Sequence, residues 1–561
     1  MVFGRLVLLL VLPALAPVGL LAMTASKYPG HPATSIEIKG ADLMARDRAI
    51  SDDAFEGRGP GTRNGEAAAQ WIADEMRRIG LKPGNHGSYF QQVPAVRIAL
   101  DAAKSSLSFG TQSGAITPKF PEETVYWTPR FKSADVNIRK SPLVFVGYGV
   151  VAPEYRWDDY TGVDVKGKTV VILINDPGNE ERPGNPAFFK GKAMTYYGRW
   201  TYKFEEAARR GAAAAIIVHE TGPAAYGWPV VRNSNSGNKL WLDTPKSNRD
   251  MVPIEGWITL DTARELFKRS GLDYDAMKAA ANKPGFKALA MNGTLLDAHT
   301  HSNFEHLNTR NVIGVVTGTK HPDDYILFTA HWDHLGIKPD VAGPDKIYNG
   351  AVDNGMGVSS VLELGEAFAR AKPQRSIAII CWTLEEQGLL GSTYFAAHPL
   401  WPLSHIVGGV NLDATLPEGH AHDLVLIGNG SSEMEDLLAD VLKSQNRTIT
   451  PDPEPEKGGF YRSDHISLSR VGVPMLDPGG GFDLVDGGTQ AGMAARDAYR
   501  TKHYHQPSDE FDPHWDVSGP IDDLLALYML GDTLANSERW PNWYKDNEFR
   551  AIRDKEMAAR K

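Results

Sequence analysis

The chain has 561 residues, of which 42% are hydrophobic and 23% charged, so a wholly disordered protein is excluded. Its 69 acidic residues outnumber the 59 Lys and Arg residues and give a net charge of −10, which excludes a general nucleic-acid binder with a basic surface. Cys381 is the only cysteine, so no intramolecular disulfide and no cysteine-ligated metal centre can form. A bound metal would need His, Asp and Glu ligands.

The N-terminal segment has the pattern of a secretory signal peptide. Arg5 precedes an apolar run that ends at Met23, and the small residues Ala22 and Ala25 follow the pattern of a processing site. We therefore predict a signal peptide over residues 1–25 and an exported protein, periplasmic or secreted, without a membrane span once the signal is removed. The alternative is a retained anchor, because the apolar run approaches the length that spans a bilayer.

A predicted helix follows, and then a region of short strands. A helix is predicted from about Asn64, which is expected to cap it, to Gly80, which is expected to end it. Residues 135–290 then carry short strands rich in β-branched residues and have no metal-ligand spacing, so we predict a smaller β-rich unit without a catalytic role.

From about residue 300 the pattern alternates between buried strands and helices. Strands are predicted at residues 325–330, 376–383 and 405–411, and a helix at residues 358–371. Such alternation predicts an α/β fold with a mainly parallel, mixed sheet flanked by helices. Ligands bind to sheets of this kind beyond the carboxyl ends of the strands.

Polar residues follow each of these strands at that same edge. They include two histidines, several carboxylates and a tyrosine: His331, Asp333, Asp353, Glu385, Glu386, Asp413, Tyr504 and His505. Imidazole and carboxylate ligands suit zinc, with cobalt or manganese as substitutes. Two divalent ions carry four positive charges against three ligand carboxylates, and a bridging hydroxide would neutralise the remainder. The sequence therefore predicts a two-metal hydrolytic site.

Other candidate residues have simpler interpretations. His334, His321 and His503 are interpreted as structural histidines rather than ligands. Asp333 is expected to orient the ring of His331, because a metal-bound imidazole needs a partner on its other nitrogen. Cys381 is interpreted as core packing.

These residues, in this order, resemble the exported co-catalytic two-zinc aminopeptidases, a family that includes the glutamate carboxypeptidases. The resemblance covers most of residues 300–510, and residues 55–83 resemble the N-terminal helix of that family. It rests on His331-x-Asp333, Asp353-Asn-Gly, Glu385-Glu386-x-Gly388, Asp413, Ser463-Asp464-His465 and Tyr504-His505-x-Pro507. Residues 135–290 resemble the protease-associated domain that interrupts many such enzymes.

The resemblance implies a role for each site residue. Two zinc ions per chain would be held by His331, Asp353, Glu386, Asp413 and His505, with Asp353 bridging both. Glu385 would be the general base for a metal-bridging hydroxide, and Tyr504 would hydrogen-bond the oxyanion. The Asp353–Asn354 peptide bond is expected to be cis. Arg462 and His465 are candidate substrate-binding residues.

The implied domain organisation is discontinuous. Residues 35–134 and 291–545 would form the zinc peptidase domain, residues 135–290 the inserted protease-associated domain, and residues 546–561 a charged C-terminal tail that could form a peripheral helix.

Several functions remain open. The first is an aminopeptidase that removes N-terminal residues from peptide substrates. The second is a glutamate-carboxypeptidase-like enzyme or a dipeptidase on the same site, which would need an Arg such as Arg462 for the substrate carboxylate. A single-zinc glutaminyl cyclase and a non-enzymatic receptor are further alternatives, and the complete ligand set disfavours the receptor.

Overall fold

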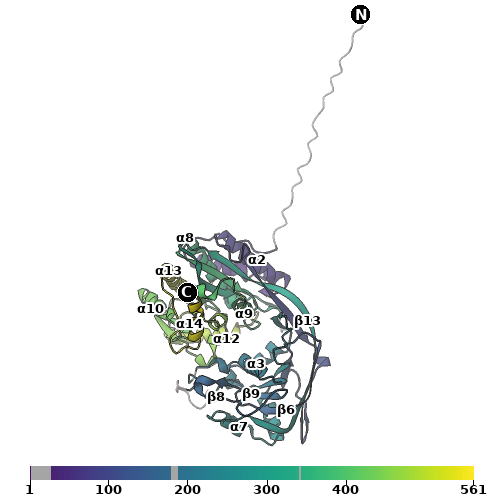
Figure 1. The fold of residues 1–561 in the computed structure, drawn as a ribbon. Coiled ribbons are helices and arrows are strands. Elements are labelled where there is room, and N and C mark those ends of the chain that lie inside the picture. The colour runs from purple at the N-terminus through teal and green to yellow at the C-terminus, as the bar shows by residue number, and fades with distance from the viewer. Residues whose placement is uncertain (2–26, 178–187, 192, 340–342, 561) are drawn as a thin grey trace.

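The computed structural model describes residues 1, 27–177, 188–191, 193–339 and 343–560. Apart from Met1, the predicted signal peptide lies outside the described residues. Within those ranges no helix combines the length and apolarity needed to cross a bilayer. The chain is mixed α/β and contains two groups of strands that share one strand, β13 (Leu289–Val316). In Figure 1 this strand runs along one edge of the molecule, past both groups.

The first group is the predicted mixed sheet. Its four central strands run parallel, and the strand next to them on each side runs antiparallel to its central neighbour. In spatial order they are β2 (Phe90–Leu100), β13, β17 (Arg375–Trp382), β14 (His321–His331), β18 (Ile406–Asn411), β21 (Met475–Pro478), β19 (Asp423–Ile427) and β20 (Thr448–Pro451). The predicted strands at residues 325–330, 376–383 and 405–411 are thus confirmed.

Strand β17 shows why these strands have almost no polar residues. Ile377, Ile379 and Cys381 enter the hydrophobic core on one face of the sheet, whereas Ala378, Ile380 and Trp382 enter the core on the other. Successive side chains of a strand point to opposite faces, so a strand covered on both sides must be apolar throughout. Cys381 is a packing residue, as predicted.

Helices cover both faces of this sheet. One face is packed by the predicted helix at residues 358–371 together with four others, and the opposite face by two short helices. The first set is α1 (Gly40–Ile50), α2 (Arg63–Arg78), α8 (Met356–Ala371), α10 (Met434–Ser444) and α13 (Ser518–Ala535); the second is α9 (Leu390–Ala397) and α11 (His465–Ser469).

The cap predicted for helix α2 is wrong by two residues. The helix begins at Arg63, and the hydroxyl of Thr62 accepts the N–H of Gly65 at 3.0 Å. Asn64 therefore lies inside the helix, where its side-chain oxygen accepts hydrogen bonds from Lys27 and Tyr28.

The second group of strands forms a smaller unit with its own core. Its four parallel strands, β6 (Asp135–Phe145), β9 (Thr169–Leu173), β10 (Ala214–Val218) and β12 (Ile254–Ile258), are flanked by antiparallel ones. The buried residues of its two hydrophobic clusters lie within residues 107–298. Helices α6 (Leu260–Arg269) and α7 (Tyr274–Ala281) pack on one face, and α3 (Trp200–Arg209) contributes Phe204 and Ala207 to the other. The strands are β4 (Gly114–Ile116), β3 (Ser106–Thr111), β13, β6 (Asp135–Phe145), β9 (Thr169–Leu173), β10 (Ala214–Val218), β12 (Ile254–Ile258) and β5 (Thr124–Trp127).

This unit extends beyond the expected range of residues 135–290. Strands β3 and β5 precede that range, and the first half of β13 continues past its end. Leu107 and Trp127 pack into its two clusters, so the hydrophobic contacts set the wider boundary.

The expected C-terminal tail, residues 546–561, contains helix α14 (Arg550–Ala559). Arg553 is only 1% exposed, and its guanidinium donates hydrogen bonds to the backbone oxygens of Ile406 and Val407. The described part of this segment therefore docks against β18 as part of the fold.

Candidate metal centre

The candidate ligands lie where the central strands end. His331 is the last residue of β14, Glu385 and Glu386 follow β17, and Asp413 follows β18. Asp353 lies in the turn Ala351–Gly355, which leads into helix α8. The parallel arrangement brings these loops to one edge of the sheet. His505 does not follow a central strand; it lies shortly after helix α12 (Gly488–Lys502).

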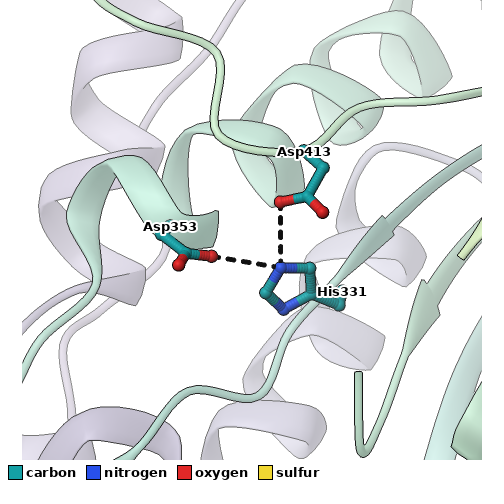
Figure 2. Close-up of side chains that lie close together, drawn as sticks. All are labelled: His331, Asp353 and Asp413. Carbon is teal, nitrogen blue, oxygen red and sulfur yellow. Dashed lines mark hydrogen bonds and ion pairs between the residues drawn. The ribbon is translucent and has the colours of Figure 1, made fainter. Parts of the chain in front are cut away.

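The first group of ligands consists of His331, Asp353 and Asp413. The Nε2 atom of His331 lies 3.1 Å from Oδ1 of Asp413 and 3.2 Å from Oδ1 of Asp353. Figure 2 shows both carboxylates pointing toward this same ring nitrogen. One ligand atom from each residue lies within 4.8 Å of the others, which is close enough to surround a single ion.

The second group uses the other oxygen of Asp353. The Nε2 atom of His505 lies 3.2 Å from Oδ2 of Asp353 and 3.1 Å from Oε2 of Glu386. Because Oδ1 of Asp353 faces His331 and Oδ2 faces His505, this carboxylate lies between the two groups. The Asp353–Asn354 peptide bond is cis, as expected.

His334 joins the second group, although the sequence pattern favoured a structural role. Its side chain is buried, and Nδ1 lies 2.7 Å from Oε1 of Glu386. His334, Asp353 and Glu386 also have ligand atoms within 4.8 Å of one another. The second group therefore has four potential donors, one more than the resemblance implies.

These residues fit a bound cation. The side chains of Asp353 and Glu386 are almost fully buried, and Nε2 of the buried His334 makes no hydrogen bond to any described residue. Burial by itself would raise the pKa of Asp353, but hydrogen bonds from His331 and His505 hold it well below its usual range. Ionised carboxylates and imidazoles that converge without thiolates are the ligand chemistry of zinc.

Glu385 lies beside the first group without joining it. Its Oε2 atom is 4.0 Å from Nε2 of His331, and burial raises the pKa of its carboxyl group well above the usual range. A carboxyl group that readily holds a proton next to the ligands has the property expected of a general base.

Asp333 differs in detail from its expected role. The partner of Nδ1 of His331 is the backbone oxygen of Asp333, at 3.0 Å, rather than its carboxylate. The Asp333 carboxylate instead accepts the backbone N–H of Glu385 at 3.1 Å. One residue thus orients a ligand through its main chain and the candidate base through its side chain.

Tyr504 and Arg462, which were also predicted to act in the site, lie outside the two groups of ligands. Tyr504 is 42% exposed and its ring stacks on that of His505, with centroids 3.9 Å apart. Arg462 is exposed, and its guanidinium lies over the ring of Tyr226 from the smaller unit.

The substrate-binding role predicted for His465 is wrong. This residue is 0% exposed, and its Nε2 atom lies 2.6 Å from the backbone oxygen of Phe460. Its position next to Ser463 and Asp464 in the motif suggested the site, but α11 turns its ring into the protein interior.

Several residues support the ligands although the sequence pattern indicates no role for them. Asp509 accepts the backbone N–H groups of Val352 and Asp353 at 3.0 and 3.1 Å. The hydroxyl of Ser463 donates to Oδ2 of Asp413. The Ser-Asp-His motif could have indicated Ser463. Asp509 lies close to His505 in sequence, but no spacing rule predicts that its carboxylate holds the backbone turn at Asp353.

The buried guanidinium of Arg58 supports the same loops. It donates to the backbone oxygens of Ile50, Trp332, Asn349 and Gly350. These contacts tie the segment after His331 to the turn before Asp353.

Comparisons with known proteins agree with this geometry. A family model described as Peptidase family M28 matches residues 311–529. A probable glutamate carboxypeptidase of Arthroderma benhamiae is 27% identical over 43% of this chain and 30% of that protein. Aminopeptidase YwaD of Bacillus subtilis is 33% identical over 31% of this chain and 35% of that protein. The chain therefore spans about a third of the length of these relatives.

Among solved structures, the aminopeptidase from Aneurinibacillus sp. strain AM-1 superposes with a TM-score of 0.51. The superposition covers 90% of this chain and 95% of that protein at 19% sequence identity, so it supports a shared fold.

Proposed function

We propose that this protein is a zinc exopeptidase, and that it acts foremost as an aminopeptidase on peptides, because residues 311–529 match the model described as Peptidase family M28. The observation that carries the proposal is the position of Asp353, whose two carboxylate oxygens face two separate sets of ligands. A shared carboxylate of this kind suits a pair of metal ions that act on one substrate carbonyl.

We assign one ion to each group of ligands. His331, Asp353 and Asp413 would hold the first, and Asp353, Glu386 and His505, with His334 beside them, the second. When bound, two zinc ions supply Lewis-acid activation of water and of the scissile carbonyl. A count of two metal ions per chain separates this proposal from a single-zinc glutaminyl cyclase.

The protein's own residues carry the proton transfer. Glu385 would take a proton from the attacking water and deliver it to the leaving amine, with its backbone held in place by Asp333. Tyr504 lies at the open side of the second group, stacked on His505, where its hydroxyl would donate to the oxyanion of the transition state.

The experiment that tests this proposal compares three kinds of substrate with and without a chelator. Amino-acid anilides and free peptides carry an N-terminal amine, whereas acetylated peptides do not. Chelator-sensitive cleavage confined to free-amine substrates is the expected result. Cleavage of acetylated peptides from the C-terminal end would replace the aminopeptidase assignment with the carboxypeptidase alternative.

Two features of the whole chain extend the proposal. We assign the unit built on β6, β9, β10 and β12 as the protease-associated domain, since it is β-rich and lies between two parts of the peptidase domain in sequence. We also propose that the protein is exported to the periplasm or secreted, on the basis of residues 1–25. N-terminal sequencing of the mature protein from cell fractions tests the export.

A further inference from the structure

One strand in the segment between β10 and β12 leaves the smaller unit and joins the larger sheet. This strand, β11 (Lys239–Leu242), pairs antiparallel with β2, with Leu240 opposite Arg97 and Leu242 opposite Ala95. The chain before and after it belongs to the smaller unit, because β10 and β12 are neighbours in the sheet of that unit. Strand β11 is therefore a direct connection between the two units.

The leucines of β11 pack beside the loop that carries the candidate base. Leu240 and Leu242 pack against a hydrophobic cluster that contains the fully buried Leu384, and Leu390 packs against the same cluster. Leu384 directly precedes Glu385, and the N–H of Leu390 donates to the backbone oxygen of Leu384 at 3.0 Å. The two leucines thus close the loop between them, and β11 shares a hydrophobic cluster with both of its ends.

Strand β11 also contacts the middle of this loop. The backbone N–H of Leu240 donates to Oε1 of Gln387 at 3.4 Å, and Gln387 lies two residues after Glu385. Within the loop, the N–H of Gly388 donates to the backbone oxygen of Glu385 at 2.8 Å. The carboxylate of Asp333 accepts the N–H of Glu385 at 3.1 Å. The position of Glu385 therefore depends both on Asp333 and on the turn that β11 contacts.

The first residue of β11 is anchored through its charge. The Nζ atom of Lys239 lies 3.8 Å from the ring centroid of Trp127, 5.8 Å from that of Trp200 and 5.9 Å from that of Trp241. It also donates a hydrogen bond to Oδ1 of Asn235 at 2.5 Å. The negative face of an aromatic ring attracts an ammonium group, and tryptophan does so most strongly. We call these three tryptophans the tryptophan box.

The tryptophan box belongs to the core of the smaller unit. Trp127 is 3% exposed and lies in a hydrophobic cluster of that unit, against which Trp200 and Trp241 pack. Its Nε1 atom donates to Oε2 of the buried Glu255 at 2.9 Å, and the two residues are partners in the pairing of β5 with β12. Strand β11, in contrast, has four residues, all of them only half-buried. A segment with so little buried surface opens easily, so its anchor in a rigid core matters.

We propose that Lys239 is a positioning residue for the reaction. Its ammonium group, held by the tryptophan box, fixes β11, and β11 in turn fixes the loop from Leu384 to Leu390 that carries Glu385. This inference rests on the proposed function, because it makes a residue of the smaller unit responsible for the placement of the general base. A change at Lys239 therefore slows turnover although it removes no ligand, no base and no group that touches the substrate.

The kinetic test uses the full-length protein at saturating zinc with alanine p-nitroanilide as substrate. Lys239→Met keeps an unbranched side chain but removes the charge. We expect kcat to fall roughly tenfold while KM stays within about twofold, because a small displacement of a catalytic group is costly. Lys239→Arg keeps a cation over the tryptophan rings and should retain most of kcat. A rise in KM alone, or equal losses of kcat in the two variants, would overturn the proposal.

Lys246→Met is the matched control for the loss of a lysine. Lys246 lies in the same segment, is exposed, and has its Nζ atom 3.7 Å from Oδ2 of Asp250. We expect kcat of this variant to equal that of the wild-type enzyme. A loss as large as that of Lys239→Met would show that the effect is not specific to the tryptophan box.

A double-variant cycle tests whether the effect passes through β11. Gln387→Ala removes the acceptor of the Leu240 N–H, and Gln387 lies outside the tryptophan box. We expect Gln387→Ala alone to lower kcat, and the double variant Lys239→Met/Gln387→Ala to lose less than the product of the two single losses. Multiplicative losses would refute the path through β11. If Lys239→Met does not fold, an unchanged kcat in Gln387→Ala refutes it instead.

Amide hydrogen exchange separates this proposal from the proposed function, because it needs no turnover. We expect the amides of residues 384–390 to exchange at least about threefold faster in Lys239→Met than in the wild-type protein, with those of β14 unchanged. That result supports the path from Lys239 to the loop even if the wild-type protein hydrolyses no peptide, which would refute only the proposed function. If the wild-type enzyme is active while Lys239→Met changes neither the exchange nor kcat, the positioning role is refuted and the proposed function stands.

Discussion

The carboxylate of Asp509 accepts the backbone N–H of Asp353, the residue whose side chain lies between both groups of ligands. The same carboxylate accepts the N–H of Val352, and the backbone oxygen of Asp509 accepts the N–H of Ala351. The turn that presents the Asp353 carboxylate is therefore held by a residue only four positions after His505. Two ligands that are distant in sequence are thus positioned by one short segment.

Replacing Asp509 should therefore weaken metal binding. In Asp509→Ala the N–H groups of Val352 and Asp353 lose their acceptor, and we expect zinc affinity to fall by about 10- to 100-fold, as for other residues that support metal ligands. Competition with a chromogenic chelator measures the affinity. Asp512→Ala is the control, because among the described residues its exposed carboxylate accepts a hydrogen bond only from the N–H of His514. Unchanged affinity in Asp509→Ala would contradict its positioning role.

Replacing Glu385 should separate chemistry from metal binding. Glu385→Gln keeps the shape of the side chain but removes the proton acceptor, so we expect kcat to fall by at least about 100-fold while both metal ions remain. Glu386→Gln is the matched comparison and should lose metal as well as activity, since Glu386 contacts His334 and His505. Metal analysis by mass spectrometry with parallel rate measurements checks both. Appreciable turnover in Glu385→Gln would rule out its role as the base.

Replacing His334 tests whether it contributes to the second group of ligands. His334→Ala removes a buried imidazole 2.7 Å from Glu386, and we expect one metal ion per chain to bind more weakly by roughly tenfold or more. His321→Ala is the control, because His321 lies beside Glu538 at the start of β14, whereas His331 lies at the end of this strand. If both variants retain two tightly bound ions, His334 is a structural histidine.

Removing metal should destabilise the folded protein. An ion that binds only the folded state stabilises it by about 4 kcal/mol at a free concentration 1,000 times its dissociation constant. We expect a chelator to lower Tm in differential scanning calorimetry, and added zinc to restore it. Asp353→Ala should begin with a low Tm that the chelator does not change further. A chelator effect of equal size in this variant would mean that the metal acts elsewhere.

His465 should make the stability depend on pH. Burial lowers its pKa to about 4 in the folded state, whereas the unfolded chain has a pKa near 6.5. The unfolded state therefore takes up a proton first, so the stability is complete above pH 6.5 and declines by up to about 3 kcal/mol as the pH falls to 4. Urea unfolding at pH 7 and pH 4.5 measures this loss. His465→Gln should show a smaller loss, and an equal loss would assign the effect to other groups.

Much of the larger sheet could be predicted because its strands are unusual in composition. Strands β14, β17 and β18 are covered on both faces, so each contains a mainly apolar run, and polar ligands follow close to where each run ends. The order of these runs, with a helix between them, is enough to place His331, Glu386 and Asp413 at one edge.

Other parts of the site depend on the backbone path after the strands, which local patterns do not determine. The motif positions of His334 and His465 gave no indication that one ring faces Glu386 while the other is turned into the core. The limits of the smaller unit were likewise missed, because Leu107 and Trp127 join its clusters through contacts that are distant in sequence.

Strand β13 has a consequence for attempts to simplify this protein. One end of the strand pairs with β3 and β6, and the other with β2 and β17, so neither sheet is complete without it. Deleting the smaller unit would leave the first part of β13 without its partners β3 and β6, while the rest of β13 still belongs to the larger sheet. A minimal catalytic fragment would therefore require a redesigned chain crossing at residues 300–302, and simple excision would yield an aggregating product.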